Sequence, residues 1–514
     1  MVSERCAGIL LHPTSLGGQG LGDLGPQAYA FADFLHRARL GLWQVLPLSP
    51  PGLGDSPYSA ISAFAGNPLL ISLERLANRG WIGHDQTHSP LPQQGRIDFE
   101  EVKAFKLPLI RQAALNFLDG SGNGDAHRGF ENFKRDQAWW LEDYVLFLII
   151  RRIQQRALWS TWPEELVRRS PEALRKFGQE YGQDLEVERA IQFAFFEQWR
   201  ALRRYCAQRA VRLVGDVAIF VNHDSADVWR NPELFHLDAN LQPTIVAGVP
   251  PDMFSATGQR WGNPLYRWDV LARENYEWWV RRMSWILKFC DFVRLDHFRG
   301  FESYWEIPAS EPTAIHGRWV KGPQDDLFRV LRERLGDLPF IAEDLGLITP
   351  EVNALRERLG IPGMKVLQFG FGDPGAHIYL PHNFSPNCVV YTGTHDNDTT
   401  LGWWQSGASA EEKRHATDYF GQPQDGMNWA LVRAAFSSVA RMALVPMQDV
   451  LGLGSEARMN IPSRPDGNWG WRLEPGMLTA ELADKLAALT AVCDRVPQAP
   501  PAAQQSWGQE EFAA

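Results

Sequence analysis

The chain has 514 residues, far more than one small hydrophobic core requires, so a barrel with insertions or two to three domains is expected. Its 51 Lys and Arg residues against 61 Asp and Glu give a formal charge of −10, which argues against a nucleic-acid partner. Neither a membrane span nor a signal peptide is predicted. The five cysteines are scattered and include no C-x-x-C pair, so we expect a cytoplasmic protein without disulfides or a zinc site.

Short apolar runs along the chain are predicted as β-strands, and helical patterns separate most of them. The strands are expected at 8–12, 42–48, 212–221, 291–296, 339–343, 364–369, 388–394 and 443–448. The helices are expected at 26–40, 270–289, 324–335, 350–359 and 427–442. Strands that alternate with helices indicate βαβ units and a parallel sheet. Eight such strands predict an α/β fold of the closed (β/α)8 TIM-barrel type.

The spacing of these strands is uneven, which indicates large insertions. Between the second and third strands, 101–118 and 131–209 have helical patterns rich in Arg, Glu, Gln and Trp. These patterns predict a mainly helical insertion subdomain over 80–210. No internal repeat is present to suggest a solenoid or an array.

A second insertion is expected over 222–290. It contains a long stretch at 231–268 that is rich in Pro, Gly, Asn and Trp, and a loop of such length in a compact protein is usually functional. We therefore predict an active-site loop insertion within a catalytic barrel that extends over 1–496. The tail at 497–514 is rich in Pro, Ala and Gln and is predicted to be disordered.

Three acidic residues, each at the end of a predicted strand, carry the main functional signal. Asp296 ends an apolar run, Glu343 follows another, and Asp396 comes directly after the seventh strand. Barrel enzymes hold their chemistry at the carboxyl ends of their strands, so these acids are expected to form a cluster. Carboxylates at close range are the usual groups for breaking glycosidic bonds.

The neighbours of the first two acids predict different protonation states. Arg294 lies two residues before Asp296, hence on the same face of the strand, and an adjacent guanidinium lowers the pKa of a carboxyl. Glu343 follows an apolar run, where burial raises the pKa and suits a general acid. The alternatives are a structural ion pair for Arg294 and Asp296 and a helix cap for Glu343, although Asp344 is the better candidate for a cap.

The third acid lies in the string His395–Asp396, whose side chains are suited to binding sugar hydroxyls. A metal site is the rival interpretation, but hard metals need several carboxylates in one loop, and no such loop is present; no metal is predicted. Tyr58, after the second strand, is a candidate to stack on a sugar ring or to contact the nucleophile. An ordinary Pro turn is the alternative there.

Residues 20–25 match G-x-G-x-x-G between a predicted strand and a helix, the context of a dinucleotide fingerprint. Residues 13–19 separate the motif from its strand, and the acid expected about 20 residues further on is absent from 42–51. A glycine-rich surface loop is therefore favoured, and no cofactor is predicted.

Taken together, these strings resemble the catalytic segments of amylomaltases, the 4-α-glucanotransferases or disproportionating enzymes related to the α-amylases. The resemblance extends from about residue 8 to 472. It is carried by 8–16, 215–221, 224–229, 249–264, 294–300, 341–346, 393–397 and 458–462. One departure is Ser463, where the family more often has Gly, and this concerns the backbone of the lid rather than the chemistry.

The resemblance implies a role for each matching residue. Asp296 would be the nucleophile, Glu343 the general acid/base and Asp396 the stabiliser of the distorted sugar. Arg294 would orient Asp296. The remaining implied residues bind sugar hydroxyls or line the donor and acceptor subsites: His395, Tyr58, Asp216, Gln259, Trp261 and Asn460. The 250–259 loop and the segment around residue 460 would arch over the cleft.

The implied activity is the retaining transfer of α-1,4-glucan segments between maltooligosaccharides through a covalent glycosyl-aspartate. Retention requires the two catalytic carboxyls to lie about 5–5.5 Å apart, against about 6.5–9.5 Å in an inverting enzyme. Three alternatives stay open: an α-1,4-glucan hydrolase with the same carboxylates, a nucleotide-dependent oxidoreductase and a non-catalytic glucan-binding protein.

Overall fold

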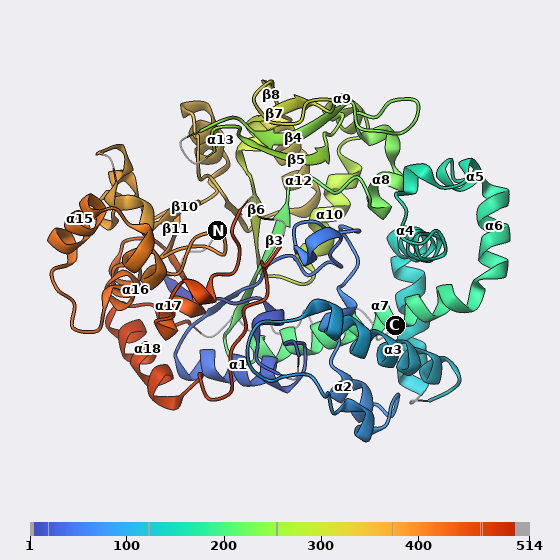
Figure 1. Ribbon diagram of the computed structural model, residues 1–514, viewed down its shortest axis with the longest axis horizontal. Helices are drawn as coiled ribbons and strands as arrows, with labels where there is room; N and C mark the ends of the chain where they lie inside the picture. Colours follow the sequence, from blue (N-terminus) through green and yellow to red (C-terminus); the bar gives the residue numbers. More distant parts are fainter. Residues whose placement is uncertain are drawn as a thin grey trace.

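The computed structural model describes residues 5–18, 20–121, 124–252, 255–372, 374–462, 464 and 466–498. At the centre of this described part is a closed barrel of parallel strands in the order β1-β12-β11-β10-β9-β6-β3-β2 (Figure 1). The barrel strands are β1 (Cys6–Leu10), β2 (Leu42–Gln44), β3 (Arg212–Ala218), β6 (Phe292–Asp296), β9 (Phe340–Ala342), β10 (Gly363–Val366), β11 (Cys388–Tyr391) and β12 (Met442–Pro446). Each overlaps a predicted strand, so the (β/α)8 prediction is confirmed.

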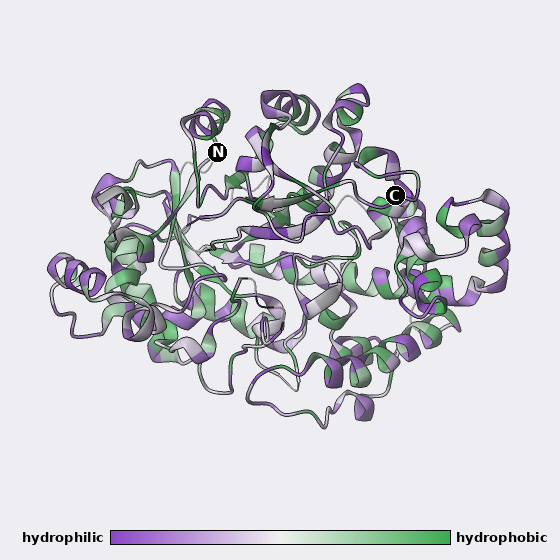
Figure 2. Ribbon diagram, turned by 45° about the horizontal axis from the view of Figure 1, so that its top comes forward, coloured by the Kyte–Doolittle hydropathy of each residue, from purple (hydrophilic) through white to green (hydrophobic). Residues whose placement is uncertain are grey.

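Helices surround the barrel, and Figure 2 shows hydrophilic residues concentrated on the outer turns of the peripheral ones. The helices are α1 (Pro26–Arg37), α2 (Leu73–Asn78), α3 (Phe99–Leu118), α4 (Gly124–Ile153), α5 (Glu164–Val167), α6 (Pro171–Glu180), α7 (Gly182–Ala207), α8 (Ala226–Arg230), α9 (Trp268–Arg273), α10 (Glu277–Leu287), α11 (Arg299–Glu302), α12 (Gln324–Leu335), α13 (Pro350–Leu359), α14 (Thr400–Gly402), α15 (Ala410–Phe420), α16 (Met427–Ser437), α17 (Met447–Leu451) and α18 (Ala480–Val492). The barrel interior is filled by apolar side chains from the strands, including Leu42, Val214, Ile341, Val389 and Leu444, so it is a packed core rather than a pore.

Local signals set some helix ends as predicted and miss others. Helix α13 begins at Pro350, where a missing N–H costs nothing, and ends before Gly360 in the left-handed region at φ 69°. The predicted helix at 270–289 is instead two helices, α9 and α10, because Tyr276 adopts φ 53° between them. The predicted helix at 427–442 is also too long, since α16 ends at Ser437 and the chain then enters β12.

A second, antiparallel sheet lies beside the barrel, at the top of the view in Figure 1. Its order is β5-β4-β7-β8. The strands are β4 (Ile245–Val249), β5 (Gln259–Pro264), β7 (Ser303–Pro308) and β8 (Arg318–Lys321). The prediction of an unbroken loop at 231–268 is therefore wrong for β4 and β5. Gly262 and Pro264 weaken the strand signal of β5, and β4 pairs with β7, which is distant in the sequence.

The helices α3 to α7 come between β2 and β3 in the chain and lie on the right of Figure 1. Helix α7 joins this part to the barrel side, since Trp199 Nε1 donates to Phe289 O at 3.2 Å. The division into 1–496, 80–210 and 222–290 stays a prediction, and 499–514 of the predicted tail lie outside the described residues, as does Ser463. Among the described helices, none is long and apolar enough to cross a bilayer.

Candidate active site

A buried guanidinium joins two acids on neighbouring strands. In the register of β3 and β6, Asp216 pairs with Arg294. Arg294 Nη1 lies 2.9 Å from both oxygens of Asp216 and 2.8 Å from Asp296 Oδ1. The Arg294 and Asp216 side chains are buried, whereas 28% of the Asp296 side chain is exposed. The predicted contact between Arg294 and Asp296 is therefore present, and of these side chains only Asp296 is partly exposed to solvent.

The electrostatics of this group keep the guanidinium charged. Burial lowers the pKa of Arg294, but Asp216 and Asp296 outweigh burial and hold that pKa well above its usual range. Burial raises the pKa of Asp216 to about 7, against the lowering effect of Arg294. The Tyr58 hydroxyl donates to Asp216 Oδ2 at 2.8 Å. Asp216 is thus fixed from two sides, and it holds Arg294 in turn.

Glu343 directly follows β9 and has no such cationic contact among its hydrogen bonds. Its Oε2 accepts from the His297 N–H at 2.8 Å, and its Oε1 accepts from the Leu345 N–H at 2.9 Å. Desolvation raises the pKa of Glu343 to about 7, with Arg294 lowering it and Asp296 raising it. Such a carboxyl can hold or release a proton near neutral pH.

Glu343 does not cap the next helix, since the N-cap residue of α13 is Thr349. The adjacent Asp344 takes the structural contacts instead: its Oδ1 accepts from the Met364 N–H at 2.6 Å and its Oδ2 lies 3.1 Å from Arg356 Nε. Asp344 therefore ties the turn after β9 to β10 and α13, and the Glu343 side chain stays available to a ligand.

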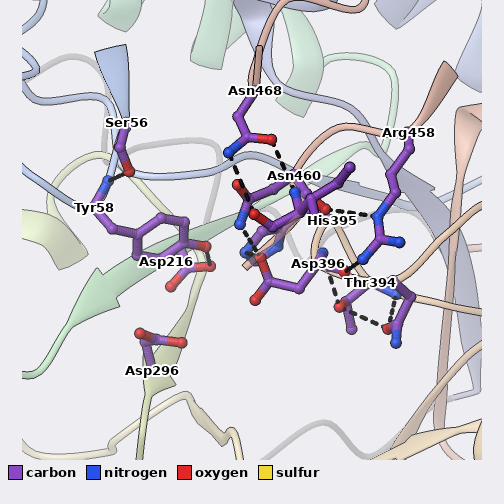
Figure 3. Close-up of polar contacts among 12 residues, drawn as sticks. Ser56, Tyr58, Asp216, Asp296, Thr394, His395, Asp396, Arg458, Asn460 and Asn468 are labelled. Carbon is purple, nitrogen blue, oxygen red and sulfur yellow. Dashed lines mark hydrogen bonds and ion pairs between the residues drawn. The ribbon is translucent and has the colours of Figure 1, made fainter. Parts of the chain in front are cut away.

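Asp396 lies in the turn after β11, and 45% of its side chain is exposed. Asn460 Nδ2 donates to Asp396 Oδ1 at 2.6 Å, and His395 Nε2 lies 3.5 Å from the same oxygen (Figure 3). Arg458 donates to the Asp396 carbonyl at 2.6 Å and to the Asn460 carbonyl at 2.8 Å. The segment 458–460 thereby fixes both the backbone and the carboxylate of Asp396.

Tyr58 connects this part of the site to the guanidinium group. Its ring stacks on His395 with centroids 5.1 Å apart and planes at 16°, while its hydroxyl reaches Asp216 (Figure 3). Burial lowers the pKa of His395, so the imidazole is neutral at pH 7. Trp469 lies against both rings, 6.0 Å from Tyr58 and 5.9 Å from His395.

Gln259 and Trp261 reach the site from β5 of the antiparallel sheet. Trp261 Nε1 donates to Gln259 Oε1 at 3.1 Å, and 39% of Trp261 is exposed. The indole meets His297 edge to face at 4.8 Å, and the His297 N–H is the donor to Glu343 Oε2. All ten residues singled out in the sequence are therefore linked, directly or through one neighbour, in one region at the carboxyl ends of the strands.

Three residues of this region were not singled out from the sequence. Arg458 lies inside the string 458–462 that carries the resemblance, so a signal for it was present. His297 directly follows Asp296, but nothing in its residue type predicts a backbone contact to Glu343. Trp469 offers no local signal, because only the fold brings it against Tyr58.

The glycine-rich loop at 20–25 packs tightly and binds its own carboxylate. A Cβ on Gly22 would lie 2.1 Å from the Leu16 carbonyl oxygen. Asp23 accepts from the Gly25 N–H at 2.9 Å at the start of α1 and pairs with Lys106 at 2.8 Å. That helix start is occupied by an acid, which argues against a phosphate there. In the described part of the chain, no group of three or more His, Cys, Asp and Glu side chains is placed to hold a metal.

Comparison with known proteins agrees with this geometry. The profile of the family described as 4-alpha-glucanotransferase matches residues 11–479. The chain belongs to this family. It is 49% identical over 505 residues to the 4-alpha-glucanotransferase of Thermus thermophilus, covering 96% of this chain and 100% of the relative. It is 45% identical over 501 residues to the 4-alpha-glucanotransferase of Synechocystis sp., covering 96% and 99%.

Two solved amylomaltase structures match this chain over most of their length. The amylomaltase from Streptococcus agalactiae in complex with acarbose has a TM-score of 0.92 at 36% identity, covering 96% of this chain and 100% of that one. The amylomaltase from Corynebacterium glutamicum, at 18% identity, has a TM-score of 0.76 and shares the fold, with 75% of that chain covered. The family resemblance predicted from the sequence is confirmed.

Proposed function

We propose that this protein transfers α-1,4-glucan segments between maltooligosaccharides by a retaining double displacement. The register of two neighbouring strands carries the proposal. Leu295 of β6 pairs with Ala342 of β9, so the next residues, Asp296 and Glu343, stand side by side. Neighbouring strands lie about 4.8 Å apart, which supports the separation of about 5–5.5 Å expected of a retaining pair.

In the first step, Asp296, oriented by Arg294 through Oδ1, attacks the anomeric carbon. The bond between that carbon and the leaving oxygen breaks, and Glu343 gives its proton to the leaving oxygen. In the second step, the 4-hydroxyl of an incoming glucan gives its proton to Glu343 and attacks the same carbon. Asp296 leaves as a carboxylate, and two inversions restore the α configuration.

The other residues bind the reacting sugar and its neighbours. Asp396, held by Asn460 and next to His395, stabilises the distorted ring and its developing positive charge. Tyr58 lines the same donor subsite, and Asp216, whose side chain is fully buried, acts through its contacts with Tyr58 and Arg294 rather than on the sugar. Gln259 and Trp261 line the acceptor side, and the half-exposed indole favours a glucan over water by excluding solvent from the cleft. Maltooligosaccharides and α-1,4-glucans are the expected partners, and a cytoplasmic location stays a prediction.

The product profile from maltotriose tests this proposal. Transfer yields oligomers longer than maltotriose together with shorter sugars, whereas a hydrolase with the same carboxylates yields glucose and maltose alone. Chromatography of the products, with Asp296→Asn as the blank, separates the two. A parent protein that gives only glucose and maltose is a hydrolase, and one that gives no product while binding the sugar is a glucan-binding protein.

A further inference from the structure

The backbone of His297 is unusual at a catalytic position. His297 adopts φ 52°, in the left-handed region, immediately after Asp296 at the end of β6. Residues other than glycine rarely adopt this conformation, and it persists only where the surroundings hold it in place. The question is therefore what this turn achieves and what maintains it.

The turn directs two successive backbone N–H groups at Glu343. The His297 N–H donates to Glu343 Oε2 at 2.8 Å, and the Phe298 N–H donates to the Glu343 carbonyl at 3.0 Å. In a continued strand, successive N–H groups point in opposite directions, so they could not both reach one residue. The left-handed turn thus links the residue after the nucleophile to the proposed acid/base.

The imidazole of His297 is packed into a position that stabilises this turn. It lies against Trp261 at 4.8 Å and Phe220 at 6.4 Å. Gly300 makes the room, because a Cβ there would lie 3.1 Å from His297 Cδ2. Burial, and then Arg299, lowers the pKa of His297 to about 3, so the ring is neutral and is not the proton carrier.

We propose that His297 is a positioning residue, whose left-handed backbone lets its own N–H and that of Phe298 both reach Glu343 and whose imidazole couples that turn to Trp261. The inference rests on the proposed function of Glu343 as the acid/base. A glucan that stacks on Trp261 would press on the same ring that holds the turn, and so would stabilise the carboxyl that acts on its glycosidic oxygen.

The hydrogen bond from the His297 N–H to Glu343 Oε2 affects the pKa of Glu343. The charged and titratable groups that face Glu343 are Arg294 and Asp296 from β6 and Tyr379. The His297 N–H acts on the same carboxyl as a neutral hydrogen-bond donor. A donor to the ionised carboxylate lowers its pKa. Loss of this donor therefore raises the pKa of Glu343 and moves the alkaline limb of the pH–rate profile upward.

Substitutions at residue 297 test the backbone directly. In His297→Val, a β-branched residue disfavours the left-handed region. We expect the alkaline limb of kcat/KM for maltotriose to rise by about 0.5 pH unit or more and kcat to fall about tenfold. In His297→Asn, a residue type that tolerates the conformation, both changes should be less than half as large. An alkaline limb that is the same in the parent and in His297→Val overturns the inference, as do equal changes in both variants.

Two further variants serve as controls, one for a general effect of strain and one for failure of His297→Val to fold. Arg39→Val places the same residue at an exposed left-handed position, φ 55°, between α1 and β2, and it should change thermal stability without moving the alkaline limb. If His297→Val does not fold, His297→Ala decides, because alanine disfavours a positive φ without the bulk of a β-branched side chain. It should move the limb in the same direction, and an unchanged limb overturns the inference.

An activated donor separates positioning from general damage. The fluoride of α-maltosyl fluoride departs with little proton assistance, so first-turnover fluoride release by His297→Val should stay within about twofold of the parent. Equal losses on fluoride and maltotriose overturn the inference. Glu343→Gln distinguishes failure of the proposed acid/base role of Glu343 from failure of the positioning role of His297. Retained maltotriose transfer by this variant overturns the role of Glu343 and this inference with it. Lost transfer with retained fluoride release upholds that role, and an unmoved limb in His297→Val then overturns the inference alone.

Discussion

Asp296 and Glu343 occupy equivalent positions at the ends of neighbouring strands, yet their surroundings differ. Asp296 contacts the guanidinium of Arg294 at 2.8 Å, and Arg294 is anchored by Asp216. The Glu343 carboxyl accepts two hydrogen bonds, both from backbone N–H groups. The Asp296 carboxyl thus contacts a full positive charge, whereas the hydrogen bonds to the Glu343 carboxyl come from neutral donors, and the charge of Arg294 offsets only part of the effect of burial on the Glu343 pKa.

This difference assigns opposite tasks to two similar side chains. Neutral donors offset only part of the cost of desolvation, and the pKa of Glu343 is raised to about 7, chiefly by burial. We therefore propose Asp296 as the group that attacks and Glu343 as the group that exchanges a proton, and substitutions of the two residues should lower activity to different extents.

The largest effect is expected from Asp296→Asn. An amide cannot form the ester intermediate, so transfer from maltotriose should fall by about 10⁵-fold, and α-maltosyl fluoride should not rescue it. The measurement is the rate of product formation by chromatography. Asp325→Asn, on the exposed start of α12, is the matched control and should keep parental activity. Substantial disproportionation by Asp296→Asn would show that another group is the nucleophile.

Glu343→Gln should have the next largest effect. The amide keeps the shape of the side chain but cannot donate an acidic proton, so kcat for maltotriose should fall about 10³-fold. Release of fluoride from α-maltosyl fluoride in the first turnover should survive, which Asp296→Asn does not allow. Equal losses on the two donors would remove the distinction between the two carboxyls.

Arg294→Lys tests the charge partner of Asp296. Lysine keeps the positive charge but loses the planar group that contacts Asp216 and Asp296 together. Misplacement of the nucleophile should lower kcat about 100-fold with a smaller change in KM. Arg356→Lys, at another buried Arg–Asp pair, should alter thermal stability more than kcat. A variant of Arg294 with parental kcat would mean that Asp296 needs charge alone.

The pH dependence of kcat/KM sharpens the comparison further. Glu343 must be protonated in the first step, and burial raises its pKa to about 7. Activity on maltotriose should therefore fall about tenfold per pH unit above that value, while the pH dependence with α-maltosyl fluoride in the first turnover should be flatter. A rate on maltotriose that stays constant to pH 9 would contradict the assignment of the acid.

The smallest effect is expected at Trp261, which we propose to line the acceptor side of the cleft. Trp261→Ala removes the half-exposed indole next to His297, so more of the intermediate should pass to water, raising the ratio of hydrolysis to transfer about threefold. Trp319→Ala is a matched control, since Trp319 is 40% exposed on β8 of the same sheet. The ratio is measured as glucose released per longer oligomer formed. An unchanged ratio in Trp261→Ala would exclude the indole from control of acceptor choice.

Local sequence patterns were enough to predict the barrel and to single out the residues that the fold then brings together. Buried parallel strands are continuous apolar runs, a local signal, and each of the eight was found within a few residues. Strand alternation placed Arg294 beside Asp296 without any tertiary information. The apolar run before Glu343 was enough to indicate a raised pKa.

The tertiary structure decided what depends on segments that are distant in the chain. The antiparallel sheet was missed because β5 contains Gly262 and Pro264, and because β4 gains hydrogen bonds by pairing with β7, which is distant in the chain. Arg458 and Trp469 reach the site only because their segment crosses the turn after β11. The left-handed turn at His297 packs against Trp261, which is distant in the chain, so no local pattern predicted it. Residue types and periodicity are local properties, whereas the geometry that separates a nucleophile from a proton carrier is made by contacts between distant parts of the chain.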